Sequence, residues 1–216
     1  MKSTVLKFTF NPIQENTYVV YDTTGECIVI DPGCCNQREY DELYSAVASL
    51  QLKPVRLLNT HCHVDHIPGN PFVANTYQLD LEIHALEIPV LASAPDYAGM
   101  FLGQEMPEMP EVKKFLSDGQ RISFGNTELL VIHTPGHSPG SVSFYNEKDQ
   151  YIISGDVLFR QSIGRYDLPG ANGPQLFQTL KEKFLTLPDE TIVHSGHGSD
   201  TSIGAERKKN PFLLKL

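Results

Sequence analysis

The first third of the chain alternates polar and apolar positions. Residues 4–10 and 17–22 alternate with a period of two, and residues 26–33 form a short apolar run that ends in a Pro-Gly pair. Such patterns predict β-strands, because alternate side chains of a strand point to opposite faces of a sheet. The turn at 22–25 predicts that the second and third strands form a hairpin.

The pattern then changes to helical spacing. Residues 37–50 place apolar side chains on one face of a helix, and these are Tyr40, Leu43, Tyr44, Val47 and Leu50. The pattern continues with a predicted strand at 55–60, a helix at 71–79 and a strand at 81–85.

Residues 86–118 are less regular and rich in Pro, Met and Gly, which predicts a helix followed by a mobile loop. Strand patterns return afterwards, at 120–125, 127–134, 141–146 and 150–156, and a helix at 174–186 and a strand at 191–196 complete the set. We find no internal repeat and no linker. A single mixed α/β domain over residues 1–216, with two strand-rich halves, is the simplest interpretation.

Charge and composition restrict the partners. The net charge is −9, and no basic run exceeds three residues, which argues against a nucleic-acid partner. No apolar run is long enough for a membrane helix, and the N-terminus is typical of a strand rather than a signal peptide. The four cysteines lack disulfide spacing, so we expect free thiols and a cytoplasmic location. Oligomeric state stays open.

Four potential metal ligands lie within the segment Thr60-His-Cys-His-Val-Asp-His66. They are His61, His63, Asp65 and His66. In an extended chain His61 and His63 point to one side and Cys62 to the other, so Cys62 is expected to be buried packing. Crowded ionisable groups repel each other unless a metal compensates, and nitrogen and oxygen donors suit zinc or iron. The offset between the donors favours two adjacent ions.

Further candidate ligands follow later apolar strands, each beside glycine. His137 lies in "HTPGHSPG", Asp156 in "IISGD" and His197 in "TIVHSGHG". Side chains at the ends of neighbouring strands form a site on a rigid sheet edge. The remaining histidines have structural interpretations: His84 as a solvated or packed side chain, and His133 and His194 as core or supporting residues.

These motifs resemble the metallo-β-lactamase fold superfamily, a four-layer αββα sandwich with a two-metal site along one edge. The resemblance covers nearly the whole chain and includes "VIDPG", "THCHVDH", "HTPGHSPGS", "SGD" and "SGHG". It implies that His61, His63 and His137 bind one ion, that Asp65, His66 and His197 bind the other, and that Asp156 bridges both. It also implies that Asp31 and Thr60 orient ligands by hydrogen bonds; local backbone capping is the alternative for this pair.

Within that superfamily "GDVLFRQSIGRYDLPGAN" resembles the small glyoxalase II-like group. The resemblance implies a hydrolase with two divalent ions, with zinc expected and iron or manganese as alternatives. The implied substrate is a small thioester of the hydroxyacylglutathione type, attacked by a metal-activated water that Asp65 orients or deprotonates. Arg165 either contacts a substrate carboxylate or pairs with Asp167 to brace its loop, and pairing is favoured.

Other activities remain to be distinguished. A secreted β-lactamase is expected to carry a signal peptide, and a cysteine at the position where this chain has Asp156. An enzyme that processes transfer RNA needs a basic surface, which this acidic chain lacks. Flavodiiron proteins differ from this chain at the position near His63. Persulfide dioxygenase is the main rival, with one iron held by the residues matching His61, His137 and Asp156. A non-catalytic metal-binding module is the alternative outside enzymes, although a structural site is usually closed by four ligands.

The chain ends 19 residues after His197, which leaves no room for the C-terminal helical domain with which glyoxalase II contacts glutathione. We therefore expect another element to complete the substrate site. One hypothesis is a lid formed by the apolar part of the 95–112 segment, namely Met100, Phe101, Leu102 and Met106. The alternative is that this segment packs on the core.

Overall fold

The computed structural model describes residues 2–215 and contains two six-stranded sheets. The first sheet follows chain order, with β1 (Thr4–Phe10), β2 (Glu15–Tyr21), β3 (Glu26–Ile30), β4 (Lys53–Leu58), β5 (Leu81–His84) and β6 (Val112–Leu116). β1 to β3 are antiparallel, whereas β3 to β6 are parallel. Parallel neighbours need long crossovers, and these are supplied by α1 (Gln37–Ser49), α2 (Asn70–Tyr77), and η1 (Ala85–Glu87) with α3 (Ile88–Phe101).

The second sheet has the order β14-β13-β10-β9-β8-β7. Its strands are β7 (Arg121–Phe124), β8 (Thr127–His133), β9 (Val142–Asn146), β10 (Tyr151–Gly155), β13 (Ile192–Ser195) and β14 (Thr201–Ser202). Between β10 and β13 lie a small hairpin, β11 (Leu158–Phe159) with β12 (Ser162–Ile163), then α4 (Gly173–Thr179) and a π-helical turn, η2 (Leu180–Phe184). α5 (Ile203–Lys209) and η3 (Leu213–Lys215) follow β14.

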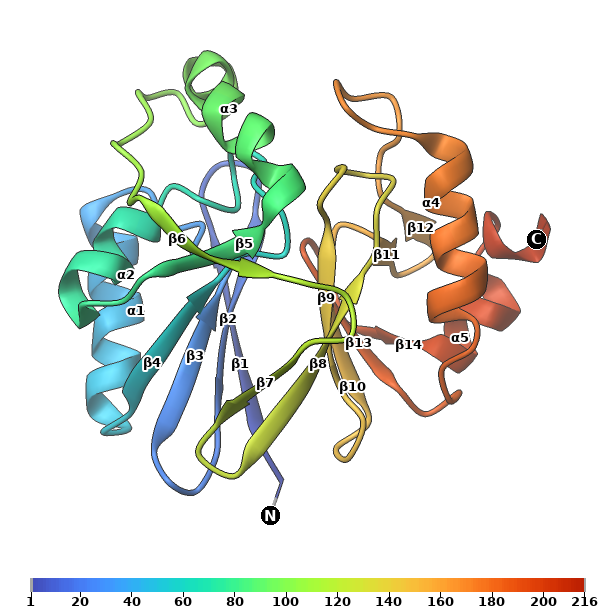
Figure 1. Cartoon of the computed structure of the whole chain (residues 1–216), viewed down its shortest axis with the longest axis horizontal. Helices are drawn as coiled ribbons and strands as arrows, with labels where there is room; N and C mark the ends of the chain where they lie inside the picture. The colour runs from blue at the N-terminus through green and yellow to red at the C-terminus, as the bar shows by residue number, and fades with distance from the viewer. Residues whose placement is uncertain (1, 216) are drawn as a thin grey trace.

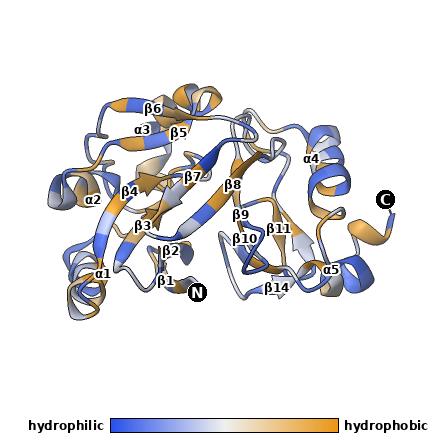
Figure 2. Cartoon of the chain, turned by 60° about the horizontal axis from the view of Figure 1, so that its bottom comes forward, coloured by the Kyte–Doolittle hydropathy of each residue, from blue (hydrophilic) through white to orange (hydrophobic). Residues whose placement is uncertain are grey.

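The layers are helix, sheet, sheet, helix, which confirms the predicted αββα sandwich (Figure 1). Strand alternation explains the layering: Tyr18 and Val20 of β2 point into the core between the sheets, while Val19 points to the core under α1 to α3. A third core lies under α4 and α5. Figure 2 shows hydrophobic segments in the strands of both sheets and hydrophilic residues on α4.

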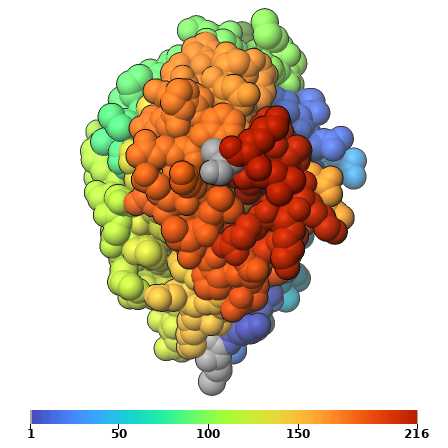
Figure 3. All heavy atoms as spheres, turned by 90° about the vertical axis from the view of Figure 1, so that its right-hand side faces the viewer, coloured from blue at the N-terminus to red at the C-terminus, as the bar shows by residue number. Residues whose placement is uncertain are grey.

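The segment at 86–118 differs from the expectation of a helix and a loop, because its end forms the edge strand β6. Lys113 and Lys114 hide the strand pattern, and lysines on an edge strand discourage pairing with another chain. The β11–β12 hairpin, β14 and α5 were not predicted either; β11, β12 and β14 have only two residues each, too few for a periodic pattern. The C-terminal segment lies against the residues of α4 and η2 (Figure 3).

Candidate metal centre

The segment 59–69 leaves β4 at the edge where the two sheets meet. Thr60 is hydrogen-bonded to β9 of the second sheet, because its carbonyl accepts from Val142 N at 2.8 Å. His66 N donates to His63 O at 3.0 Å and closes the turn. As predicted, Cys62 points away from the histidines into the core and is fully buried, while the rings of His61 and His63 lie 4.7 Å apart.

Three groups of donor atoms lie beside this turn: two match the predicted ligand sets, and the third joins Asp31 to His61 and His66. The first contains His61, His63 and His137, and the second contains Asp65, His66 and His197. Within each group the donor atoms all lie within 4.8 Å of one another, which is close enough for a single cation to contact all three. His63 Nδ1 is 2.9 Å from His137 Nε2, and His197 Nε2 is 3.1 Å from Asp65 Oδ2.

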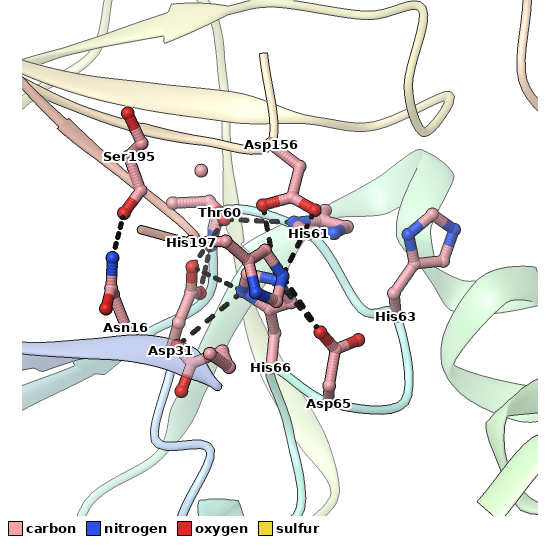
Figure 4. A network of polar contacts seen from close by, with 12 residues as sticks. Asn16, Asp31, Thr60, His61, His63, Asp65, His66, Asp156, Ser195 and His197 are labelled. Atoms are coloured by element: carbon pink, nitrogen blue, oxygen red, sulfur yellow. Dashed lines mark hydrogen bonds and ion pairs between the residues drawn. The ribbon is translucent and has the colours of Figure 1, made fainter. Parts of the chain in front are cut away.

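Asp156, which follows β10, lies between the two groups. One carboxylate oxygen is 3.5 Å from His66 Nε2 of the second group, and the other is 3.5 Å from His137 Nε2 of the first. Figure 4 shows the Asp156 carboxylate facing His66 and His197, with His63 at the edge of the set. The structure therefore brings together all seven residues that the sequence proposed as ligands.

Asp31 and Thr60 make the contacts expected of ligand-orienting residues. The Thr60 hydroxyl donates to Asp31 Oδ2 at 2.5 Å, so its lone pair accepts from His61 Nδ1 at 3.1 Å. His66 Nδ1 donates to the same carboxylate oxygen at 3.1 Å. Asp31 has φ +48°, a conformation that costs free energy for a residue with a side chain, and these hydrogen bonds compensate for it.

Backbone carbonyls orient two more imidazoles. His137 Nδ1 donates to Arg165 O at 2.8 Å, and His197 Nδ1 donates to Gln14 O at 3.2 Å. Each bond fixes the tautomer and directs the Nε2 lone pair toward the cluster. The predicted Arg165–Asp167 pair is present at 3.0 Å, and both side chains are exposed. The sequence did not reveal the contribution of the Arg165 carbonyl.

Three buried atoms of the cluster lack any hydrogen-bond partner: His61 Nε2, His66 Nε2 and Asp156 Oδ1. An unpaired polar atom inside a protein costs about 1–3 kcal/mol, so three together need a compensating group. All three atoms belong to imidazole or carboxylate groups, which are the ligands that divalent transition metals prefer once the imidazole nitrogen has released its proton. The residues present therefore fit a divalent metal centre.

The two groups differ in protonation when no cation is bound. Burial, together with the neighbouring His137, lowers the pKa of His63 to about 3, and burial also lowers the pKa of His61 and His137. In the second group burial opposes the imidazolium, yet the carboxylates of Asp156 and Asp65 raise the pKa of His197 to about 10.

Carboxylates and imidazoles also balance one another across the cluster. Burial opposes ionisation of Asp156, but His197 and His66 hold the pKa of Asp156 well below its usual range. The cluster therefore combines ionised carboxylates with neutral imidazoles in the first group, and both kinds of group are ready to bind a cation.

Glu87 is a buried acid that the sequence analysis missed. It is fully shielded from solvent and connects the two loops that carry ligands. Oε2 accepts from Cys62 N at 2.7 Å, and Oε1 accepts from Gly140 N at 2.7 Å and from the Ser138 hydroxyl. A glutamate in the apolar stretch "ALEIPVL" was the available signal.

The remaining histidines lie outside the cluster, as expected. His84 stacks on His133 with ring centroids 4.4 Å apart, and His133 Nε2 donates to Pro139 O. His194 Nδ1 lies 3.0 Å from Asp200 Oδ2.

A cavity of about 900 Å³ opens above the cluster, and His63, Asp65, His137, Asp156 and His197 are among the residues that line it. Of the four residues proposed as a lid, Met100 and Phe101 line this cavity. Leu102 and Met106 instead pack on the core, so the lid hypothesis is wrong for these two. Among the described residues no helix has the length and apolarity to cross a bilayer.

Comparison with known proteins agrees with this geometry. Residues 10–197 match the family model of the metallo-beta-lactamase superfamily. The chain is 38% identical to the probable metallo-hydrolase YqgX of Bacillus subtilis, over 94% of this chain and 93% of that protein. It is 31% identical to hydroxyacylglutathione hydrolase GloC of Haemophilus influenzae, over 93% of both.

Solved structures show the same fold. BLEG-1 B3 metallo-beta-lactamase superposes with a TM-score of 0.89 at 37% identity, covering 97% of this chain and 99% of that one. The di-iron-bound form of TTHA1623 superposes with a TM-score of 0.86 at 40% identity, covering 97% and 100%. This chain therefore belongs to the metallo-beta-lactamase superfamily, and its cluster of histidines and aspartates is suited to divalent metal ions.

Proposed function

We propose that this chain is a binuclear metal-dependent hydrolase that cleaves thioesters in the manner of glyoxalase II. The observation that carries the proposal is the pair of three-donor groups joined by Asp156, with lone pairs left unpaired in both groups. Relatedness to hydroxyacylglutathione hydrolase GloC supports the choice of thioesters.

In this proposal the first group, His61, His63 and His137, holds one ion, and the second group, Asp65, His66 and His197, holds the other, with Asp156 shared. When bound, two such ions supply a water-derived nucleophile at neutral pH and polarise the carbonyl group. Zinc is the expected metal, with iron or manganese as alternatives; the di-iron-bound form of the similar TTHA1623 supports iron.

In this proposal the side chain of Asp65 accepts the proton of the attacking water. Its Oδ2 faces His66 and His197, whereas Oδ1 forms no hydrogen bond or ion pair with any residue in the 2–215 range. Oδ1 therefore orients the water and accepts its proton. The water oxygen bonds to the acyl carbon, the C–S bond breaks, and the proton reaches the departing thiolate. The products are a carboxylic acid, which ionises, and a thiol.

Metal analysis combined with substrate assays tests the proposal. Protein expressed without added zinc or iron is expected to hold two ions per chain and to hydrolyse S-lactoylglutathione or a simple acyl thioester. One iron per chain with oxygen uptake on glutathione persulfide supports the rival persulfide dioxygenase instead. Bound metal without turnover of any thioester supports a non-catalytic metal-binding module. Either result overturns the hydrolase proposal.

The similarity to BLEG-1 B3 metallo-beta-lactamase favours a second candidate, hydrolysis of β-lactam rings. The same arrangement of ions and Asp65 suits attack on a strained cyclic amide. An assay with nitrocefin separates the two activities: a kcat/KM for nitrocefin above that for every thioester replaces the thioesterase proposal by a lactamase one.

A further inference from the structure

The cavity above the cluster has one strongly apolar wall, formed by α3, whose place in the fold is labelled in Figure 1. Val90, Ala94, Tyr97 and Phe101 line the cavity and recur with helical spacing, and Met100 lies beside them. Met100 is 81% exposed and Tyr97 is 37% exposed.

α3 is apolar on its other side as well, where Ala98 and Leu91 pack on the core. A helix on the surface of a globular protein normally turns a polar face to solvent. In α3 the only charged residue is Asp96. Val90 and Ala94 also pack on this core, whereas Tyr97, Met100 and Phe101 belong to no core cluster of the described residues and line the cavity together with His63.

The opposite wall differs because it carries cationic side chains. It comes from the β11–β12 hairpin and the loop after it, with Phe159, Leu168, Arg160 and Arg165 at the cavity. Arg165 is paired with Asp167. Arg160 forms no ion pair with any residue in the described part of the chain, so its charge is available to an anionic group.

We propose that the substrate is a thioester with an apolar, medium-length acyl chain that lies along α3, while its polar thiol carrier lies on the Arg160 side. This inference rests on the proposed thioesterase function and names its substrate class. Biological thiol carriers are polar and bear carboxylates or phosphates, so they match the cationic wall. An acyl chain matches the apolar wall, since removing methylene groups from water favours binding. Glutathione bears two carboxylates and one ammonium group, whereas among the described residues that line this cavity Arg160 is the one arginine or lysine outside an ion pair.

Hydrolysis of a series of N-acetylcysteamine thioesters, from acetyl to octanoyl, tests the acyl site because the carrier stays neutral and constant. We expect kcat/KM of the metal-loaded enzyme to rise roughly twofold per methylene, about 60-fold over the series. A flat series, or a preference for S-lactoylglutathione over the octanoyl ester, overturns the inference and leaves the thioesterase proposal intact.

A double variant, Tyr97→Gln with Met100→Gln, makes the wall polar. The ratio of octanoyl to acetyl kcat/KM is expected to fall to about one tenth of its wild-type value. Ile88→Gln is the matched control, because Ile88 lies on the same helix and is 40% exposed but does not line the cavity. It is expected to keep the wild-type ratio. Equal ratios in all three proteins contradict the assignment of the acyl site.

Direct binding keeps the inference testable if no thioester is hydrolysed. Calorimetry with ketone analogues, in which a methylene replaces sulfur, is expected to show tighter binding of the heptyl ketone, which corresponds to the octanoyl ester, than of the methyl ketone. Equal affinity overturns the apolar site independently of catalysis. Light scattering tests the alternative occupant of the α3 wall, which is a second copy of this chain, because it measures whether the protein is a dimer. A dimer that the double variant dissociates, together with a flat acyl series, assigns the wall to self-association.

Discussion

The floor of the cavity, by which we mean the seven candidate metal ligands, and the α3 wall of the same cavity differ in how their side chains are fixed in position. On the floor, His61 and His66 are buried and hydrogen-bonded to Thr60 and Asp31, and the second nitrogens of His137 and His197 are bonded to backbone carbonyls. On the wall, the ring of Tyr97 lies 6.4 Å from the ring of Phe101, and Tyr97 makes no hydrogen bond with any other described residue.

This difference reflects what each region must achieve. Ligands must be positioned within about 0.5 Å for the reaction, which requires that supporting residues fix every ring. Contact with an acyl chain requires only an apolar surface, because the hydrophobic effect has no direction. Substitutions on the floor should therefore be costly even when they preserve shape, whereas those on the wall should change rates in proportion to lost apolar contact.

The strongest test of the floor is Asp156→Ala, which removes the carboxylate whose two oxygens approach His66 of one donor group and His137 of the other. We expect kcat/KM for thioesters to fall by about 1,000-fold or more and the metal content to drop below two ions per chain. Asp167→Ala is the control, since Asp167 is exposed and pairs only with Arg165. A fully active Asp156→Ala enzyme contradicts the shared-ligand role.

Asp31→Asn tests whether a substitution that preserves the shape of the side chain still lowers the affinity for metal. The amide replaces one oxygen by a donor, so the new side chain cannot accept from Asn59, Thr60 and His66 together. We expect metal affinity to fall about 10- to 100-fold, measured by competition with a chelating dye. The control Asp41→Asn alters an exposed carboxylate bonded to Gln37 and should bind metal normally. Unchanged affinity in Asp31→Asn argues that Asp31 only shapes its turn.

Glu87→Gln tests the restraint between the two ligand loops. The amide nitrogen of the new side chain takes the place of one carboxylate oxygen. A hydrogen-bond donor then faces a donor from Cys62, Ser138 or Gly140, and that hydrogen bond is lost. The free energy of unfolding should decrease by about 1–3 kcal/mol, measured by denaturant titration. kcat should fall more than KM rises, because Glu87 does not line the cavity. Glu128→Gln, at an exposed pair with Arg121, serves as the reference. A loss of stability with normal kcat would limit Glu87 to folding.

The smallest effect on stability is expected for a substitution of Asp200, which tests whether hydrogen bonds outside the cavity floor also support the ligand loops. Asp200 accepts from Lys7 and pairs with His194, and Lys7 also donates to Gly198 O next to His197. Burial opposes its ionisation, but His194 and Lys7 lower the pKa of Asp200 below 3.8. Its contribution to stability is thus present above pH 3.8 and is lost as the pH falls through the folded-state pKa.

Asp200→Asn should therefore lower Tm by no more than about 3 °C at neutral pH. The difference from wild type should disappear in acid, followed by thermal melts across the pH range. Asp96→Asn, an exposed change on α3, should match wild type at every pH. A Tm difference for Asp200→Asn that grows toward low pH contradicts the sign of this linkage.

The residue patterns alone predicted a mixed α/β domain with two strand-rich halves and the members of the cluster, whereas the four layers were implied by the family resemblance. The alternation of apolar residues in β2 and β3 and the spacing in α1 are local patterns, and they predicted elements that the structure contains. The ligand candidates were recognisable because several donors lie within six residues, and because each of the other three follows an apolar strand beside glycine. Short elements such as β14 and the β11–β12 hairpin carry no period long enough to detect.

Tertiary structure decided which groups support the cluster and which face the substrate. The sequence named Asp31 and Thr60, but it did not reveal Glu87, the carbonyls of Gln14 and Arg165, or the division of residues 100–106 between cavity and core. These contacts join positions up to 183 residues apart. Local residue type and spacing determine which strands, helices and donor groups can form. The packing of two sheets against each other determines which distant atoms come within hydrogen-bonding distance, and no local pattern encodes that meeting.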